Sequence, residues 1–338
     1  MNLLLIHPTA KESKDVENHL WMQTSYAFIS SYKQRIAALD RAIQNNQQQQ
    51  QQQKQHPPQR QNNHGPVEYR KLTQRFRQFL ADEEKFWTQL VLRLCRLFDL
   101  QEARPALQAI DVLGRTDDVT HTSANTEGIV ETRDGVVHSS NGRNHFQFPP
   151  EDPTVSFSPT TPEERATRLA ILTKAIICLG DIARYRVLYI ESGGRPKAGH
   201  DDGSSARRGR NRRGGAAAEA FPRQKTYDKA QRCYEQARLL LPYEGNPSHQ
   251  LAILASYKKD PFTALVHYYR ALCVRQPYDT AAENLGTVLT KALELWRQQI
   301  RRGEKRVDTP LVRIEAFKEK VVVLHALWRV GMDKGIEK

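Results

Sequence analysis

Two arginines in the segment LGDIARYRVLY (179–189) are well suited to bind an anion. Arg184 and Arg186 interrupt an apolar helical pattern, and a guanidinium held beside apolar walls keeps its charge and offers a rigid fork to a carboxylate or phosphate. Asp181 stands one helical turn before Arg184, so a structural ion pair along the helix explains the same letters. From these residues alone, an ion pair of Arg184 with Asp181 that serves the fold is favoured over anion binding by Arg184.

Three further polar residues are weaker candidates. Lys33 and Arg35 in YKQRIAALD indicate, by themselves, a solvated helix face. Gln250 in NPSHQLAIL is placed to grip a peptide backbone, but a surface glutamine behind Asn246 at a helix start explains it equally well.

The positive charge of the chain is concentrated in two segments. A net charge of +13 ordinarily favours a nucleic-acid partner. The Gly/Ser-rich stretch 195–213 holds Arg207, Arg208, Arg210, Arg212 and Arg213, and the stretch 297–306 holds Arg297, Arg301 and Arg302. Clustered arginines without aromatic neighbours bind phosphate with little sequence preference, and a solvated loop accounts for the first stretch as readily.

Motifs for catalysis are missing from the sequence. It has no GxxxxGK[ST] phosphate loop, no HExxH, no GxSxG and no Cys/His metal spacing. The carboxylate pairs Glu83-Glu84 and Glu163-Glu164 are expected at helix surfaces or helix starts, as solubilising or dipole-complementing charges. We therefore expect a protein that is not an enzyme and uses no cofactor or metal.

The four cysteines and the start of the chain bear on its compartment. The cysteines lie far apart within apolar helical patterns, which favours a reducing, intracellular setting. The apolar run in MNLLLIHPTA is too short for a signal peptide or a membrane span, so no membrane association is expected.

A repeated spacing indicates the scaffold that positions these groups. Ala230, Tyr234 and Ala237 recur 34 residues later as Ala264, Tyr268 and Ala271. Leu251-Ala252 likewise recurs as Leu285-Gly286, and Leu179-Gly180 corresponds to both pairs once the 191–224 stretch is removed. This period is typical of tetratricopeptide-like helical hairpins, in which small residues allow close helix approach and stacked neighbours bury a shared core.

Helical periodicity extends over most of the chain. Helices are predicted at about 12–44, from Pro66 to about Phe98, and at 162–190, where Thr161 and Glu164 form a capping box. Hairpin pairs follow as 162–190 with 225–241, 246–258 with 261–276, and 279–300 with 310–330. Low-complexity or aperiodic composition predicts disordered inserts at about 45–66, 111–160 and 191–224. No segment alternates as a strand, so the predicted class is all-α.

Three segments carry a resemblance to a known family. LWMQTSYAFISSYKQRIAAL (20–39), LGDIARYR (179–186) and GNPSHQLAILASYKKDPFTALVHYYRALCVRQPYDTAAENL (245–285) resemble the ever-shorter-telomeres and SMG adaptor proteins, which serve telomerase and nonsense-mediated mRNA decay. The resemblance covers nearly the whole chain outside the inserts. It implies a 14-3-3-like helical domain at about 1–240 and TPR-like hairpins from 241 to 338, continuing past the chain end.

The resemblance also implies a phosphate site. The 14-3-3 phosphate-binding lysine corresponds to Lys33 in SYKQ, and the Arg-Tyr pair corresponds to Arg184 and Tyr185 in GDIARY. This reverses the structural interpretation of Arg184. A second 14-3-3 arginine falls at Asp40, so the third phosphate contact is undetermined, and Gln250 takes the place of a residue that holds the peptide backbone.

Three functional hypotheses follow. In the first, the chain is a non-enzymatic adaptor, cytoplasmic and nuclear, that binds phosphoserine peptides of a phosphorylated Upf-type RNA helicase of mRNA surveillance. In the second, it is a telomerase-associated subunit whose clustered arginines contact RNA or single-stranded DNA. In the third, it is a plain TPR scaffold for an unmodified protein.

Overall fold

The protein is a layered array of helices. A computed structural model describes residues 2–7, 10–52, 64–113, 148, 155–189, 226–302 and 310–336. Its helices are α1 (Asn2–Ile6), α2 (Val16–Leu20), α3 (Tyr26–Gln52), α4 (His64–Leu97), α5 (Arg104–Ala109), α6 (Pro162–Leu188), α7 (Asp228–Leu240), α8 (Asn246–Tyr257), α9 (Pro261–Cys273), α10 (Thr280–Arg302) and α11 (Pro310–Ile336). Within these residues there is no strand, only one isolated bridge between Glu244 and Gln276, which confirms the all-α prediction.

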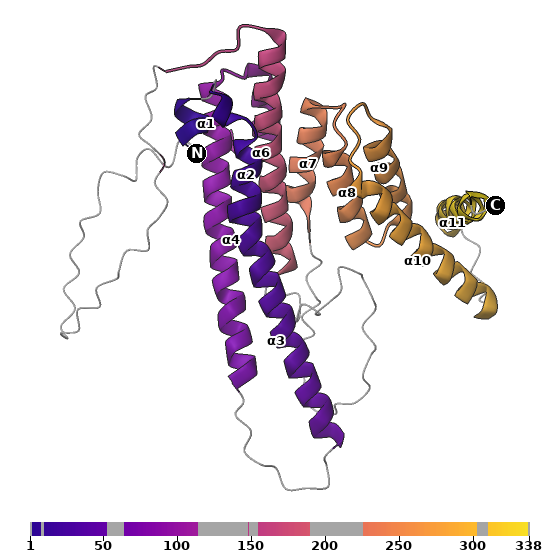
Figure 1. Ribbon diagram of the computed structural model, residues 1–338. Helices are drawn as coiled ribbons and strands as arrows, with labels where there is room; N and C mark the ends of the chain where they lie inside the picture. The colour runs from indigo at the N-terminus through magenta and orange to yellow at the C-terminus, as the bar shows by residue number, and fades with distance from the viewer. Residues whose placement is uncertain are drawn as a thin grey trace, which may run out of the picture.

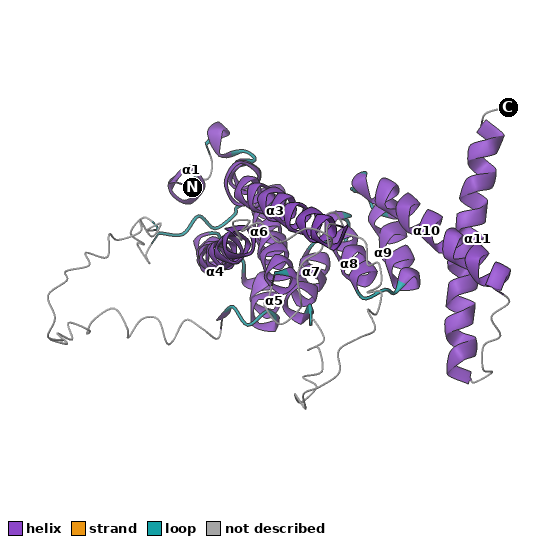
Figure 2. Cartoon of the chain, turned by 90° about the horizontal axis from the view of Figure 1, so that it is seen from below, coloured by secondary structure: helices purple, strands orange, loops and turns teal. Residues whose placement is uncertain are grey.

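The helices stack mostly in chain order. The long helices α3, α4 and α6 lie side by side, followed by α7, α8, α9, α10 and α11 (Figures 1 and 2). The closest pairs include α6 with α7, α8 with α9, and α10 with α11, which are the predicted hairpins. The repeat residues Ala230, Tyr234, Ala237, Ala264, Tyr268 and Ala271 are all buried.

Gly180 shows why small residues are needed between the hairpin helices. A Cβ atom at Gly180 would lie 2.6 Å from Cε1 of Tyr234 and 3.0 Å from Cβ of Cys233. The equivalent Gly286 is less constrained, because a Cβ there would lie 2.8 Å from Nη2 of Arg329, the end of a flexible and exposed side chain. Gly180 therefore admits no larger side chain without a shift of the neighbouring helix, whereas at Gly286 the Arg329 side chain would have to move.

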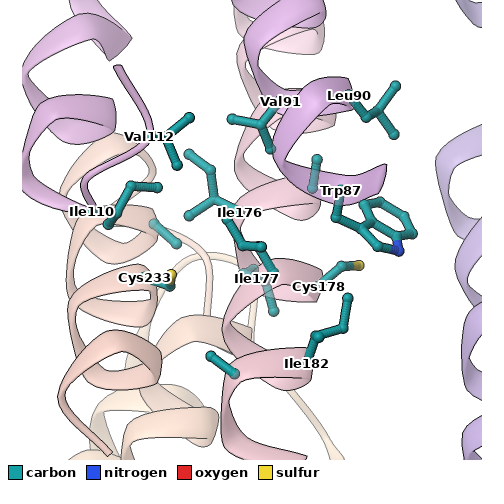
Figure 3. Packing of buried hydrophobic residues seen from close by; sticks show 14 of the residues in the cluster. Trp87, Leu90, Val91, Ile110, Val112, Ile176, Ile177, Cys178, Ile182 and Cys233 are labelled. Atoms are coloured by element: carbon teal, nitrogen blue, oxygen red, sulfur yellow. The ribbon is translucent and has the colours of Figure 1, made fainter. Parts of the chain in front are cut away.

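The main core is centred on α6. Helix α6 is buried continuously from Ile171 to Tyr185 apart from the partly buried Lys174, which agrees with its apolar residues on two faces. Figure 3 shows Ile176 among Val91 of α4, Ile110 beyond α5 and Cys233 of α7. A second cluster joins α8 to α11 and includes Ala252, Leu285 and Val322. Enclosure of α6 on several sides fixes the residues at its carboxyl end.

The first helix differs from its prediction in two ways. Asp15 has φ 59°, a left-handed conformation that separates a short 3-10 turn at Lys11–Ser13 from α2, so the helix begins at Val16 and not near residue 12. A π-helical turn, Trp21–Ser25, then joins α2 to α3. Its last residue, Ser25, donates a hydrogen bond of 2.5 Å to the Glu83 carboxylate of α4. A π turn is a local insertion, which strict helical periodicity does not predict.

Two of the predicted inserts contain residues that the structure describes. Helix α3 continues to Gln52 and α4 begins at His64, so part of the predicted 45–66 loop is helical, in accord with the good helix propensity of glutamine. The end of the 111–160 stretch is anchored to α4, since Phe157 N–H donates to the Leu97 carbonyl at 2.7 Å. The predicted capping box starts α6, with Glu164 N–H donating to Thr161 Oγ1 at 3.1 Å.

Candidate phosphate-binding site

Lys33, Arg184 and Tyr185 lie together in the structure. Lys33 Nζ of α3 is 5.3 Å from the centre of the Tyr185 ring, and Cζ of Arg184 is 4.7 Å from the same centre. Arg184 and Tyr185 are buried near the end of α6, and Lys33 is partly buried on α3. Two helices far apart in the sequence thus bring two cations to one aromatic ring, an arrangement favourable for an anion.

The guanidinium of Arg184 is held by three helices. Its Nη2 donates to Asp181 Oδ1 at 3.0 Å within α6, its Nε to the Tyr234 hydroxyl of α7 at 3.3 Å, and its Nη1 to the Tyr257 hydroxyl of α8 at 3.3 Å. Tyr234 in turn donates to Asp181 Oδ1 at 2.6 Å. Three of the five N–H groups are used in this cluster, which leaves one on each terminal nitrogen. The fork is therefore fixed in orientation and retains donors.

Burial and neighbouring charges shift the pKa values of the groups in this cluster. Burial alone would lower the pKa of Arg184, but the Tyr234 and Asp181 oxygen atoms raise it well above its ordinary value. Burial, reinforced by the charge of Asp181, raises the pKa of Tyr234. Burial is also the main reason why the pKa of Tyr185 is raised. Arg184 is thus permanently charged and both phenols are protonated at neutral pH.

Both interpretations of Arg184 are represented in this geometry. The structural pair with Asp181 is present. The same arginine also contacts the ring of Tyr185, which Lys33 contacts as well, and these are the three residues that the family resemblance implies. Asp181 offsets the charge of Arg184, whereas Lys33 has no ion pair among the described residues and supplies the remaining positive charge of the group.

Gln250 lies on α8, the helix that also carries Tyr257. It is 9% exposed, its Nε2 is 3.4 Å from Asn246 Oδ1, and its Oε1 has no hydrogen-bond partner in the described part of the chain. Tyr257 is seven residues further along α8, which places both side chains on one face about two turns apart. A role for Gln250 next to the phosphate site remains a prediction.

The position of the second 14-3-3 arginine is not basic in this structure. Asp40 is fully buried on α3 and accepts a hydrogen bond of 3.0 Å from Gln44. Arg41, its neighbour, is exposed, and its Nε lies 3.4 Å from the Ala37 carbonyl of its own helix.

The predicted nucleic-acid residues divide into two groups. Arg297, Arg301 and Arg302 are exposed in the last two turns of α10. The remaining predicted contacts lie outside the described residues: Arg207, Arg208, Arg210, Arg212 and Arg213.

Several polar contacts were not anticipated from sequence. Glu84, expected at a helix surface, is 7% exposed and forms ion pairs with Arg186 of α6 and Lys229 of α7. Its neighbour Glu83 accepts hydrogen bonds from Ser25 and Trp87. The surface prediction for Glu83-Glu84 is wrong because Ser25 of the π-helical turn and residues of α6 and α7 contact this part of α4. In contrast, Glu163 and Glu164 are at the start of α6, as expected.

His249 on α8 is a further buried group near the site. Its ring packs at 4.7 Å from Tyr278 and 5.7 Å from Tyr268. Burial, with a contribution from the Arg184 charge, lowers the pKa of His249 to about 4. The imidazole is therefore neutral at physiological pH.

Two absences apply to the described part of the chain. None of its helices is long and apolar enough to cross a bilayer. It also contains no group of three or more histidine, cysteine or acidic side chains with the arrangement of a metal site.

Known proteins match this chain in two consecutive segments. Residues 15–189 match the model of the telomerase activating protein Est1, and residues 230–327 match the model of the Est1 DNA/RNA binding domain. The Lys33, Arg184 and Tyr185 group falls in the first segment, whereas Tyr234, Gln250 and Tyr257 fall in the second.

Relatives of this chain include proteins named for nonsense-mediated mRNA decay and a protein named for telomerase binding. The nonsense-mediated mRNA decay factor SMG7 of Arabidopsis thaliana is 36% identical over 112 residues, which are 33% of this chain and 8% of the relative. SMG7 of Danio rerio is 44% identical over 66 residues, 20% of this chain and 6% of the relative. The telomerase-binding protein EST1A of Danio rerio is 29% identical over 149 residues, 44% of this chain and 8% of the relative.

These matches span less than a tenth of each relative's length. They agree with the resemblance seen in the sequence. Because the Est1 model matches just over half of its residues, the chain belongs to the family of the telomerase activating protein Est1.

Proposed function

We propose that this chain is a non-enzymatic adaptor of mRNA decay that binds a phosphoserine peptide. The observation that carries the proposal is the meeting of Lys33 and Arg184 at the ring of Tyr185. The ligand would be a phosphorylated RNA helicase of mRNA surveillance, in keeping with the SMG7 relatives. The adaptor would work in the cytoplasm and the nucleus.

Charge and geometry support a phosphate in preference to a carboxylate. Asp181 offsets one positive charge, and Lys33 adds another at the Tyr185 ring, which Arg184 also contacts. A phosphate carries nearly two negative charges and three acceptor oxygens, so it can use both cations at once. A carboxylate has one charge and two oxygens.

The test is a fluorescence-anisotropy titration of a helicase-derived phosphoserine peptide and its unphosphorylated form. Only the phosphorylated form should bind the wild-type protein. Lys33→Gln should weaken binding about 10-fold to 100-fold, since a hydrogen bond to a charged group contributes about 1.5–3 kcal/mol. Arg184→Lys keeps the buried charge next to Asp181 while removing the fork, and should weaken binding to a similar degree.

Arg35→Gln is the matched control. Arg35 is exposed on α3 two residues after Lys33, so its loss changes the net charge equally without touching Tyr185. Equal binding of both peptide forms, or equal effects of Lys33→Gln and Arg35→Gln, would refute the phosphate site. The first of these results would favour the plain scaffold.

A second candidate function is nucleic-acid binding. It is supported by the Est1 DNA/RNA binding domain match at 230–327 and by exposed Arg297, Arg301 and Arg302 on α10. Here affinity for telomerase RNA or single-stranded telomeric DNA should fall steeply with salt, and replacing the three arginines by glutamine should lower the salt slope. A flat salt dependence argues against this function.

A further inference from the structure

Two hydroxyl residues before α6 are each followed by a proline. They are Ser158 and Thr161, in the sequence FSPTTPEE (157–164). Kinases of the proline-directed class transfer phosphate to a serine or threonine that stands directly before a proline. The residue before a proline is kept out of the helical region and close to extended backbone, which is the form in which such a kinase takes its acceptor. The sequence therefore offers two acceptors, and the structure distinguishes them.

Thr161 belongs to the start of α6. Its Oγ1 accepts a hydrogen bond of 3.1 Å from Glu164 N–H, and Pro162 is the first residue of the helix. An extended chain through Thr161 and Pro162 would break this cap and unwind the first turn of α6. The fold therefore disfavours Thr161 as a kinase substrate.

Ser158 lies outside the helices. Residues 155–161 form neither helix nor strand, and Ser158 is exposed. Its hydroxyl makes two polar contacts, at 3.5 Å to Asp99 Oδ2 and at 3.1 Å to Ser156 Oγ, and both lie on the surface. A kinase could therefore take Ser158 without unwinding any helix.

We propose that Ser158 is a phosphorylation site for a proline-directed kinase and that Thr161 is not. In this reaction a bond forms between Oγ of Ser158 and the γ-phosphorus of ATP, while the bond from that phosphorus to the β,γ-bridging oxygen breaks. ADP leaves with the electron pair of the broken bond, and the hydroxyl proton passes to a carboxylate of the kinase. Ser158 is not part of the candidate phosphate site, so this modification goes beyond the proposed function and does not depend on it.

A phosphate on Ser158 would weaken the contact of this segment with α4. The neighbouring Phe157 packs against the main core, and its N–H donates to the Leu97 carbonyl at the end of α4 at 2.7 Å. The phosphate would carry nearly two negative charges next to the Asp99 carboxylate and near the negative end of the α4 dipole. Repulsion from both would favour conformations in which Phe157 no longer bonds to Leu97.

The first test incubates the intact protein with ATP and a mitogen-activated protein kinase and locates the phosphate by mass spectrometry. Ser158 should be phosphorylated and Thr161 should not. A synthetic peptide of residues 155–166 is too short to form the capped helix, so both residues should accept phosphate there. The preference for Ser158 over Thr161 should be at least about 10-fold greater in the protein than in the peptide, because the cap is present only in the protein.

Ser158→Ala should lose the modification, whereas Ser156→Ala, which removes an exposed serine without a following proline, should keep it. Phosphate on Thr161 of the intact protein, or none on Ser158, would overturn the proposal. The same preference in protein and peptide would overturn it too, because the fold would then not select the acceptor.

A second measurement follows the hydrogen exchange of the Phe157 amide by NMR. Exchange should be about 10-fold faster in the phosphorylated protein, whereas Glu164 N–H should keep its rate. Asp99→Asn removes the charge next to Ser158, and asparagine suits the left-handed conformation of this residue, which has φ 47°. In this variant phosphorylation should accelerate the exchange less. An unchanged rate in the phosphorylated wild type would overturn the weakened contact with α4.

Discussion

Removal of the Tyr234 hydroxyl should destabilise the fold more than removal of the equivalent hydroxyl one repeat later. In Tyr234→Phe, Asp181 loses a donor at 2.6 Å and Arg184 Nε loses an acceptor at 3.3 Å. All three side chains are buried. In Tyr268→Phe, at the same repeat position, the hydroxyl lost is hydrogen-bonded to the neutral Ser256.

The expected magnitudes follow from the charges of the partners. A hydrogen bond to a charged group contributes about 1.5–3 kcal/mol, and one between neutral groups about 0.5–1.5 kcal/mol. Because both bonds of Tyr234 belong to one network, their contributions do not simply add. We expect a loss of about 3 kcal/mol in unfolding free energy for Tyr234→Phe and about 1 kcal/mol for Tyr268→Phe.

Urea unfolding followed by far-UV circular dichroism measures both losses. The two variants remove the same atom from buried tyrosines that are 34 residues apart, so differences in ring packing are small. Equal destabilisation of the two variants would refute the reasoning, because the charged partners would then contribute nothing beyond an ordinary hydrogen bond. A loss below about 1 kcal/mol for Tyr234→Phe would refute it as well.

Two further stability predictions concern a buried imidazole and a close helix contact. The pKa of His249 is lowered from 6.5 to about 4, so the unfolded chain binds the proton first as the pH falls. The contribution of neutral His249 to the free energy of unfolding is therefore complete above about pH 6.5 and is lost towards pH 4. At pH 5 the loss is about 2 kcal/mol. Urea unfolding at pH 7 and pH 5 should show that His249→Leu lacks this part of the loss, and identical pH dependence in both proteins would contradict the assignment. Gly180→Ala should cost about 1–3 kcal/mol because its Cβ would overlap Tyr234. In the same assay Gly331→Ala, where a Cβ would meet nothing within 4 Å, should be neutral or stabilising; similar changes in both variants would show that α6 and α7 are less closely packed than described.

The helices and their pairing could be predicted because both depend on local patterns. Apolar spacing and the 34-residue period locate the hairpins, and small residues such as Gly180 mark their contacts. The pair of Asp181 and Arg184 could also be predicted, since both residues lie on adjacent turns of one helix.

Contacts across the fold could not be derived from such patterns. Tyr234 and Tyr257 reach Arg184 from 50 and 73 residues away, and their repeat spacing explains only that their rings fill space. Glu84 is buried where Arg186 of α6 and Lys229 of α7 meet it, which its own helix does not reveal. The meeting of Lys33 with Arg184 was implied by family resemblance, not by residue spacing.

The hydrogen-bond network of Arg184 with Asp181, Tyr234 and Tyr257 joins segments that match two separate family models. Its arginine and Asp181 belong to the segment 15–189, whereas the two phenol hydroxyls belong to 230–327. Each segment expressed by itself would lack the hydrogen bonds that cross between them: Arg184 would lose its two phenol acceptors, and the Tyr234 hydroxyl would lose Asp181. When the two segments are mixed in solution, they should associate more tightly if a phosphopeptide is present. The ligand would then stabilise the contact between the two segments.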